Sequence, residues 1–497
     1  MLVPFQGFAP DQPALGHPGE TDAQNCVPLT QKSYGPFAAL STVTDALTAR
    51  CQGGSSFRAS DGTVHTFAGD ATKLYKKGSG TSWEDVSKAG GYNTASDGMW
   101  RFAQYGDIIL ATNYADAIQA YTLNVSTDFA DLAAAAPKAR YIEVIRDFVV
   151  VADTLDGTDG AVQNRVWWSA AGDPTSWPTP GTSAAAAAQS DFQDISFGGQ
   201  INGIVGGVGG RDGVIFLQNA IVTMNYTGPP TVFSFVDAER GRGTTIPGSI
   251  VNAGLFASYI AEDGHYLFDG SNSHPVGNLK VDRWFWDNVN QQFLSRICTA
   301  INPKRKLLMI AWPTTSSTGN PDRISIYNWE TKWWSYVNED VEYIMKGYLG
   351  GYTLEELDAF GNMDTLTLSL DSPAWMGGRV IGGGFNAEHK FGFFDGANKA
   401  PTIISGEWPN QGGKRVFCSG VRPVTDHSSG SSQISVGYRD TQGGSLTYTT
   451  ATSQGADGVC PQRISSRYMR AKWTAGSGDT WTHCQGIEPT IKPEGAR

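Results

Sequence analysis

Short apolar runs separated by glycine-containing turns dominate the pattern of hydrophobic and polar positions along this chain. The runs at 148–153 (FVVVAD), 307–313 (LLMIAWP) and 341–350 (VEYIMKGYLG) have the length and composition of β-strands. Asp-Gly or Gly-Asp pairs recur between such runs, and Asp-Gly favours a hairpin because the turn needs positive φ. These pairs stand at 61–62, 106–107, 212–213 and 263–264. The pattern predicts an all-β protein.

Helical patterns are scarce. The stretch at 126–140 is rich in alanine, but Pro137 ends any helix there. The alanine run at 181–191 (GTSAAAAAQSD) is of low complexity, and we interpret it as a flexible loop. One helical turn is predicted within 352–362 (YTLEELDAFGN).

One phrase occurs twice, 46 positions apart. LYKKGSGTSWEDV at 74–86 and AYTLNVSTDFADL at 120–132 share two aromatic residues eight positions apart, an acid two positions later, and then an aliphatic residue. The aromatic and acidic members are Tyr75, Trp83, Asp85, Tyr121, Phe129 and Asp131. We interpret the two phrases as the same hairpin in consecutive structural repeats.

The phrase returns in looser form further along the chain. These copies carry the aromatic pairs Trp168 and Trp177, Tyr226 and Phe235, and Tyr327 and Trp334. A spacing near 50 residues is typical of a β-propeller, in which each blade is a four-stranded sheet. The spacing predicts about six or seven blades, with the aromatic residues wedged between neighbouring blades. Chance recurrence in an aromatic-rich β protein is the alternative.

The two ends of the chain differ from the middle. Residues 1–45 contain six prolines up to Pro36 and are predicted to form an extended arm that is part of a platform. Residues 46–405 are the predicted propeller. Residues 406–497 lack the repeated phrase and show alternating strands with Gly/Ser turns, which predicts an antiparallel, sandwich-like β platform domain.

Composition narrows the class of protein. The chain has 497 residues, a net charge of −11 and 60 glycines, which suits short strands and tight turns. An acidic balance argues against a protein that grips nucleic acid by neutralising phosphates. The six cysteines are far apart with no C-x-x-C pair, so we expect neither a disulfide framework nor a zinc site. The chain shows neither a signal-peptide pattern nor a membrane span, which predicts folding in the cytosol.

Two loops carry candidate binding residues. Asp153, Asp156 and Asp159 lie on one glycine-containing loop, where three carboxylates could hold Ca²⁺, although a solvated turn explains them as well. Arg240 and Arg242 lie on a glycine turn, where they could contact a carboxylate or phosphate of a partner, or serve the turn itself.

Catalytic motifs are missing from the sequence. The seven histidines are dispersed, and neither a G-x-S-x-G elbow nor a phosphate-binding loop is present. Glycosidase chemistry needs two facing carboxylates, and no local spacing nominates such a pair. We therefore expect a protein that is not an enzyme and that needs no cofactor.

The order of several motifs resembles the tail nozzle (tail hub) family of short-tailed bacteriophages over nearly the whole chain. The motifs are PALGHPGETDAQNCVPLTQKSYGPF (13–37), TSWEDVSKAGGY (81–92), WRFAQYGDIILATN (100–113), RVWWSAAGDPTSW (165–177), ERGRGTTIPGSIV (239–251), EDGHYLFDG (262–270), VDRWFW (281–286), SSRYMRAKW (465–473) and DTWTHCQGIE (479–488). Gly16 and Ser466 depart from the family pattern, which usually has Asn and Gly there.

The resemblance implies a β-propeller beside a platform built from the N-terminal arm and the C-terminal strands. It implies a homo-hexamer below the portal and its adaptor protein, with a channel that passes viral DNA without sequence-specific binding. Tail fibres or spikes would dock around it, and the protein would belong to the virion tail, assembled in the host cytoplasm with no membrane anchor. An acidic channel would repel phosphate, so DNA could slide. The alternative is a propeller that binds or hydrolyses host surface glycans, which facing carboxylates in a central funnel would favour.

Overall fold

A computed structural model describes residues 2–17, 19–78, 80–349, 379–408, 414–427 and 431–494 of the protein. The fold is all-β, as the sequence pattern predicts. Among these residues there are two α-helices, α1 Ser183–Ala188 and α2 Asp282–Asn288, and two 3₁₀ helices, Pro247–Ser249 and Gln291–Arg296. The predicted helical turn at 352–362 lies outside the described residues.

Seven groups of four antiparallel strands follow one another, here called sheets I to VII. Sheet I contains β6 Gly53–Arg58, β7 Val64–Gly69, β8 Leu74–Lys77 and β9 Trp83–Asp85. Sheet II contains β10 Arg101–Tyr105, β11 Ile108–Thr112, β12 Gln119–Thr122 and β13 Ala130–Asp131. Sheet III contains β14 Lys138–Ile145, β15 Phe148–Asp156, β16 Gly160–Trp168 and β17 Asp191–Asp194.

The later sheets repeat this hairpin order. Sheet IV contains β18 Ile201–Gly206, β19 Gly213–Leu217, β20 Ala220–Gly228 and β21 Val232–Arg240. Sheet V contains β22 Val251–Asn252, β23 Ala257–Ala261, β24 Gly264–Phe268 and β25 Ser273–Pro275. Sheet VI contains β26 Cys298–Asn302, β27 Leu307–Trp312, β28 Arg323–Asn328 and β29 Trp333–Asn338. Sheet VII contains β30 Val341–Leu349, β31 Arg379–Asn386, β32 Lys390–Asn398 and β5 Ala38–Ala46.

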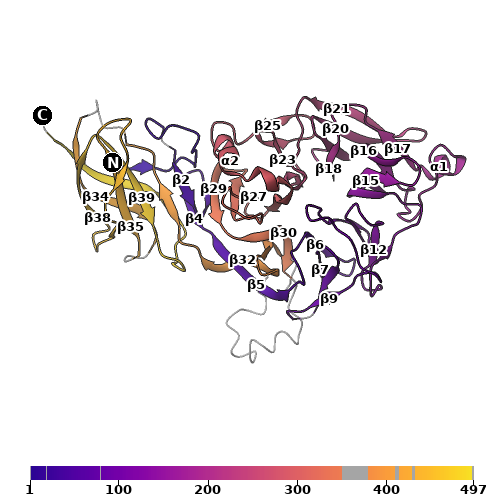
Figure 1. The fold of residues 1–497 in the computed structure, drawn as a ribbon. Coiled ribbons are helices and arrows are strands. Elements are labelled where there is room, and N and C mark those ends of the chain that lie inside the picture. The colour runs from indigo at the N-terminus through magenta and orange to yellow at the C-terminus, as the bar shows by residue number, and fades with distance from the viewer. Residues whose placement is uncertain are drawn as a thin grey trace.

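The first strands of the seven sheets form a closed circuit of neighbours. Each first strand contacts the first strand of the next sheet, from β6 through β10, β14, β18, β22 and β26 to β30. β30 in turn contacts β6, so the last sheet meets the first. Figure 1 shows the sheets following one another around a common centre. The two copies of the repeated phrase form the hairpins β8–β9 and β12–β13, the third and fourth strands of consecutive sheets, as predicted.

Sheet VII joins the two ends of this circuit. Its fourth strand, β5, comes from the N-terminal part of the chain and pairs antiparallel with β32, with Ser41 opposite Phe393. β5 lies on the arm side of the sequence boundary at 45–46, yet it pairs inside sheet VII. The reason is that β30, β31 and β32 supply only three strands, and the edge of β32 needs a partner for its backbone groups.

The chain termini build two further sheets beside the circuit, which we call the terminal sheets. One continues sheet VI, because β29 pairs parallel with β2, and contains β2 Asp22–Gln24, β33 Thr402–Ile404, β39 Tyr468–Thr474, β35 Gln433–Arg439, β36 Thr447–Tyr448 and β37 Thr452–Ser453. The other contains β1 Val3–Pro4, β3 Cys26–Thr30, β4 Ser33–Pro36, β34 Val416–Thr425, β38 Cys460–Ser466 and β40 Cys484–Pro493. Figure 1 shows both termini on this side of the molecule.

The terminal sheets pack face to face over one apolar core. Cys418 and Val421 of β34 share a buried cluster with Ile434 of β35 and with Met469 and Trp473 of β39. β33 belongs to this layer although it lies before the sequence boundary at 405–406. N-terminal and C-terminal strands therefore form one structural unit.

The alanine run at 181–191 is not the flexible loop that the sequence predicts. Residues Ser183–Ala188 form α1, and Thr182 Oγ1 accepts a hydrogen bond from Ala185 N at 3.2 Å. Gln189 ends the helix in the left-handed conformation, with φ 58°. The high helix propensity of consecutive alanines, together with a threonine N-cap, explains the difference.

Candidate functional site

The repeated aromatic residues lie between neighbouring sheets. Phe67 of sheet I packs against Tyr121 and Phe129 of sheet II, with ring centroids 5.3 and 5.7 Å apart. Between sheets III and IV, Trp168 packs against Phe235 at 6.1 Å. Tyr226 of sheet IV likewise contacts Phe148 of sheet III, whereas Tyr75 pairs with Trp83 within sheet I and Tyr327 pairs with Trp334 within sheet VI. Trp177 joins the buried cluster between sheets II and III. These side chains build the cores rather than a ligand site.

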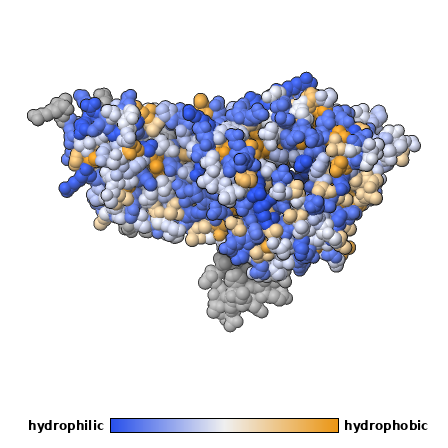
Figure 2. Space-filling view, viewed as in Figure 1, coloured by the Kyte–Doolittle hydropathy of each residue, from blue (hydrophilic) through white to orange (hydrophobic). Residues whose placement is uncertain are grey.

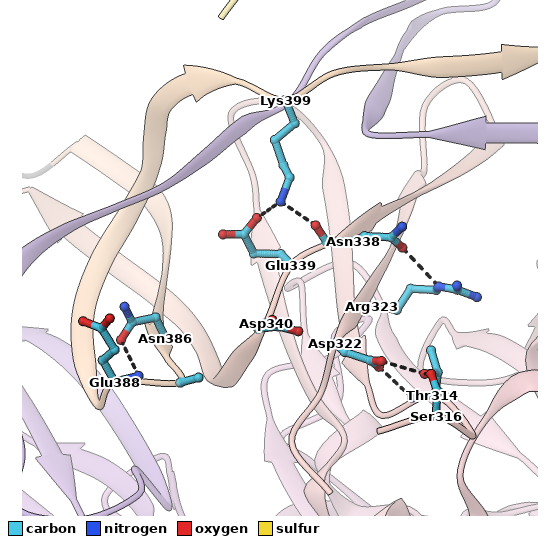
Figure 3. Close-up of a pocket in the computed structure, with 11 residues that line it drawn as sticks. Thr314, Ser316, Asp322, Arg323, Asn338, Glu339, Asp340, Asn386, Glu388 and Lys399 are labelled. Atoms are coloured by element: carbon cyan, nitrogen blue, oxygen red, sulfur yellow. Dashed lines mark hydrogen bonds and ion pairs between the residues drawn. The ribbon is translucent and has the colours of Figure 1, made fainter. Parts of the chain in front are cut away.

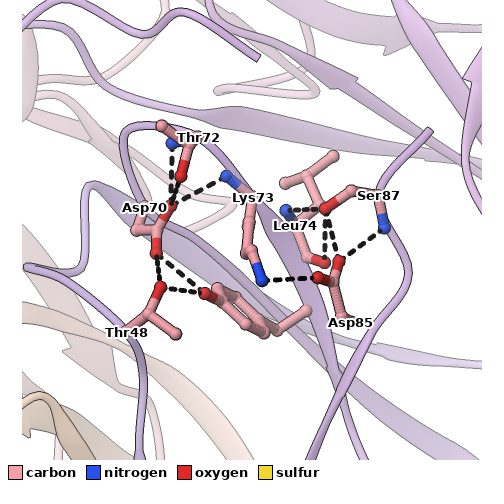
Figure 4. A network of polar contacts seen from close by, with 8 residues as sticks. Thr48, Asp70, Thr72, Lys73, Leu74, Asp85 and Ser87 are labelled. Atoms are coloured by element: carbon pink, nitrogen blue, oxygen red, sulfur yellow. Dashed lines mark hydrogen bonds and ion pairs between the residues drawn. The ribbon is translucent and has the colours of Figure 1, made fainter. Parts of the chain in front are cut away.

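Tyr75 and Asp85 of the first phrase take part in polar contacts beside sheet I (Figure 4). The buried Asp70 carboxylate accepts hydrogen bonds from Tyr75 Oη at 2.8 Å and from Thr48 Oγ1 at 2.9 Å. Lys73 Nζ lies 2.8 Å from Asp85, the acid of the phrase. Asp131 of the second copy is also paired, but its partner Lys88, with Nζ at 2.8 Å, comes from the segment between sheets I and II. The hydrogen bond from Lys88 holds the pKa of Asp131 below its usual value. The acid of the first copy thus pairs beside its own sheet, whereas the acid of the second copy links sheet II to the segment that follows sheet I.

The three loop aspartates do not converge on one point. Asp153 lies 2.6 Å from Arg140 Nε, whereas Asp156 and Asp159 lie 3.4 and 2.6 Å from Arg165 Nη1. Across the described ranges, no group of three acidic, cysteine or histidine side chains could hold a metal ion. Each of the three carboxylates is therefore paired with an arginine.

Arg240 and Arg242 both bind acids of their own chain. Arg240 is paired with Asp237, and Arg242 with Glu239. The Arg240 side chain keeps 67% of its surface exposed, so it retains donors for a partner, while the Arg242 guanidinium lies 4.5 Å from the centre of the Tyr266 ring. This geometry is compatible both with a structural role of the two arginines in the turn and with contact to a partner.

A central cavity lies where the first strands meet. It has a volume of ≈ 250 Å³, and every first strand contributes to its lining. Its polar side chains include Ser55, Arg101, Glu143, Asn252 and Thr299. Glu143 is the one carboxylate among the described lining residues.

Glu143 has an unusual electrostatic environment. Burial raises the pKa of its carboxyl group to about 7, and hydrogen bonds from the backbone N–H groups of Val144 and Gly206 offset only part of the effect. The hydroxyl groups of Tyr141 and Thr299, on either side of this cavity, have no hydrogen-bond partner among the described residues. No sequence motif points to Glu143, although an acid inside the apolar run YIEVI is a usable signal.

A second cleft, of ≈ 610 Å³, lies between sheets VI and VII (Figure 3). Asp322 accepts hydrogen bonds from Thr314 N at 2.7 Å and from Thr314 Oγ1 at 2.6 Å. Lys399 is paired with Glu339 across the cleft. The cleft is rich in acids, but most of its polar groups form hydrogen bonds or ion pairs with one another. We therefore interpret it as a polar contact region between the two sheets.

Most of the face shown in Figure 2 is hydrophilic, with hydrophobic residues scattered in small groups. None of the helices in the described ranges has the length and apolar character needed to cross a membrane.

Comparisons with known proteins give no family for this chain. No family model matches it, and no curated protein matches it. Among solved structures it is similar to a protein from Bacteroides uniformis named as a candidate 6-phosphogluconolactonase, at 12% identity and a TM-score of 0.34, covering 56% of this chain and 82% of that one. It is also similar to a functionally unknown protein from Desulfotomaculum acetoxidans, at 13% identity and a TM-score of 0.34, covering 60% and 89%. Scores this low carry no information about function.

Proposed function

We propose that this chain is a structural subunit of a short bacteriophage tail, a nozzle protein built as a seven-bladed β-propeller beside a platform. The seven blades are sheets I to VII, closed by the N-terminal strand β5. The platform comprises the terminal sheets, from residues 2–37 and 402–494. The closed circuit of first strands supports the propeller, because in that fold each blade begins at the central axis.

One observation carries the proposal: strands from both ends of the chain form a single sheet beside the propeller. β1, β3 and β4 come from the first 36 residues, and they pair with each other or with β40, which ends at Pro493. The resemblance to the nozzle family implies a platform built in this way, from strands of both ends of the chain. The order of nine motifs along the chain is the second support.

A DNA channel has to lie between copies of the chain. The central cavity has a volume of ≈ 250 Å³, which accommodates only a small molecule. A DNA duplex, whose major groove alone is about 12 Å wide, is too large to pass through it. A conduit for DNA therefore requires several chains in a ring, and we propose a homo-hexamer that binds the portal adaptor and carries fibres or spikes. The net charge of −11 would keep DNA from adhering to the wall.

The glycosidase alternative has less support. A central funnel active site would need two facing carboxylates, and Glu143 is the one carboxylate among the described lining residues. The assembly proposal is tested by imaging the purified protein alone and after mixing with the connector complex of its phage. Six copies around an open centre support a nozzle. Monomers that stay off the connector contradict it.

A further inference from the structure

The central cavity contains a positive charge without a partner of opposite charge. Arg101 of β10 lines this cavity and is half-buried. Among the described residues its guanidinium makes no ion pair and one weak hydrogen bond, from Nη2 to the thioether sulfur of Met99 at 3.9 Å. A guanidinium has five N–H donors, and a thioether is a weak acceptor. Most of the hydrogen-bonding capacity of Arg101 is therefore unused in the single chain.

The charge of Arg101 lies close to the centre of the circuit of sheets. It acts on the hydroxyl of Tyr141 in sheet III, on the thiol of Cys298 in sheet VI and on the hydroxyl of Tyr343 in sheet VII. Burial raises the pKa values of Cys298 and Tyr343 to about 12, and the Arg101 charge offsets part of this increase. Because sheet III and sheets VI and VII are separated along the circuit, a single charge that acts on all three has to lie near the centre.

Ser55 supplies a second donor from the neighbouring strand. It lies on β6, which contacts β10, and it lines the same cavity. Its side-chain hydroxyl makes no hydrogen bond within the described ranges. The Asn252 amide, by contrast, is engaged by the backbone of Gly206 and Gly254. Arg101 and Ser55 are therefore the side-chain donors that a ligand in the cavity can use.

These groups select the ligand by charge and by size. The charge of Arg101 repels a cation, and an apolar ligand would leave the guanidinium donors unpaired and desolvated. A carboxylate or phosphate group matches the planar guanidinium, because two of its oxygens accept two parallel N–H donors. The volume of ≈ 250 Å³ lies below the usual range of about 300–1,000 Å³ for small-molecule sites, so the ligand has to be small.

We propose that the central cavity binds a small oxyanion, a carboxylate or a phosphate group, through the guanidinium of Arg101. The Ser55 hydroxyl donates a further hydrogen bond to the anion. The proposal concerns binding alone. It is independent of the nozzle function, because one chain contains every residue that the site uses.

Glu143 makes the affinity of this site depend on pH. It is the one carboxylate among the described lining residues, and burial raises its pKa to about 7. The hydroxyls of Tyr141 and Tyr343 and the thiol of Cys298 stay protonated near neutral pH, because burial raises their pKa values. Arg101 stays charged. Ionisation of Glu143 therefore adds a negative charge to the cavity as the pH rises from 6 to 8, and this charge repels an anion.

The test titrates the full chain with sodium phosphate and, separately, with sodium acetate in a calorimeter, at an ionic strength held constant with sodium chloride. Arg101→Met removes the guanidinium and keeps an unbranched side chain. Arg101→Lys keeps the charge but loses the planar fork, and it provides the result should Arg101→Met misfold. Arg463→Met is the matched control, because Arg463 of β38 is exposed and makes no ion pair among the described residues.

We expect at least one of the two anions to bind the wild type and Arg463→Met equally, and to bind Arg101→Met at least about tenfold more weakly. Arg101→Lys should have an intermediate affinity. Binding of acetate alone identifies a carboxylate ligand, and binding of phosphate alone identifies a phosphate. Absence of binding of both anions to the wild type would overturn the proposal, as would wild-type affinity in both Arg101 variants or an equal loss in Arg463→Met.

The pH dependence is measured with acetate, which stays ionised between pH 6 and 8. The wild type should bind acetate more tightly at pH 6 than at pH 8, and Glu143→Gln should remove the difference. Equal wild-type affinity at the two pH values would contradict the placement of the anion beside Glu143 in the central cavity.

Discussion

The indole ring of Trp83 stacks on the phenyl ring of Phe385, with centroids 5.8 Å apart and planes 29° apart. Trp83 belongs to β9 of sheet I and Phe385 to β31 of sheet VII, so this contact joins the first sheet to the last. Trp83 Nε1 also donates to the Asp45 carbonyl at 3.2 Å, just before the end of β5. The circuit of sheets is thus fastened by side chains as well as by β5.

Removing this stack should loosen the closure. Trp83→Ala deletes a half-buried ring, and we expect it to lower the free energy of unfolding by about 2 kcal/mol, below the full cost of a buried tryptophan. Urea unfolding followed by fluorescence measures the change. Val125→Ala, at a side chain that is 78% exposed, is the control and should change the value by less than about 0.5 kcal/mol. Equal effects of the two substitutions would show that the stack contributes nothing.

The pairing of β5 with β32 depends on Gly392. A Cβ at this position would lie 2.2 Å from the Ser41 carbonyl oxygen, so Gly392→Ala has to push β5 away. We expect a loss of about 2 kcal/mol and faster proteolysis near residue 41. Gly443→Ala, where a Cβ meets nothing within 4 Å, is the matched control. If both variants resist protease as the wild type does, β5 does not close the circuit through this register.

The sequence predicts the repeated parts of this fold better than its closure. The phrases at 74–86 and 120–132 identify equivalent hairpins because the aromatic residues that separate adjacent sheets recur at fixed positions within each hairpin. β5 carries no such signal. Its place in sheet VII depends on a partner strand about 350 positions later, and pairing at that distance leaves no local pattern.

Site residues were harder to predict than packing residues. Asp153, Asp156 and Asp159 are close in sequence, but their partners are Arg140 and Arg165, which approach from different directions. The sequence shows which groups are charged, whereas only the fold shows which charges meet. A pocket on sheet III shows the same limit, because segments near 135, 157, 167 and 192 line it together.

Glu20 should make stability depend on pH. It is 1% exposed and accepts hydrogen bonds from Gln6 N at 2.7 Å and Gly7 N at 2.6 Å. Burial raises its pKa from 4.5 to about 7. Between these two values the folded state holds the proton more tightly than the unfolded state, so stability falls as pH rises from 4.5 to 7, by up to about 3 kcal/mol.

Substitution isolates this contribution. Glu20→Gln cannot ionise, so its unfolding free energy should lack this loss between pH 4.5 and 7. Relative to the variant, the wild type should therefore become less stable as the pH rises to 7. Urea unfolding at several pH values measures that difference. Glu84→Gln, at an exposed acid, is the control. A difference between wild type and Glu20→Gln that stays constant with pH would mean that Glu20 does not titrate in this range.

Arg165 should contribute to stability through three acids. Its side chain is 6% exposed, and Nε lies 2.7 Å from Asp194 in addition to the contacts with Asp156 and Asp159. Arg165→Met leaves these carboxylates without their cation, and we expect a loss of about 2 kcal/mol, moderated by the exposure of Asp159 and Asp194. In a double-mutant cycle with Asp159→Asn, the coupling energy should be about 1 kcal/mol.

The same loop tests the calcium interpretation. Because arginines engage the three aspartates, calcium chloride should leave the melting temperature of the wild type unchanged, and a chelator should have no effect. A rise of the melting temperature with calcium that is lost in Asp156→Asn would restore this loop as a metal site.

The central claim is that several copies of this chain surround a channel that the single chain lacks. The most direct measurement is the native mass of the purified protein over a range of concentrations, with electron micrographs of the largest species, alone and on the connector complex. The account predicts six copies in a ring with an open centre, with the terminal sheets in the contacts between copies. A protein that stays monomeric in both settings would contradict it.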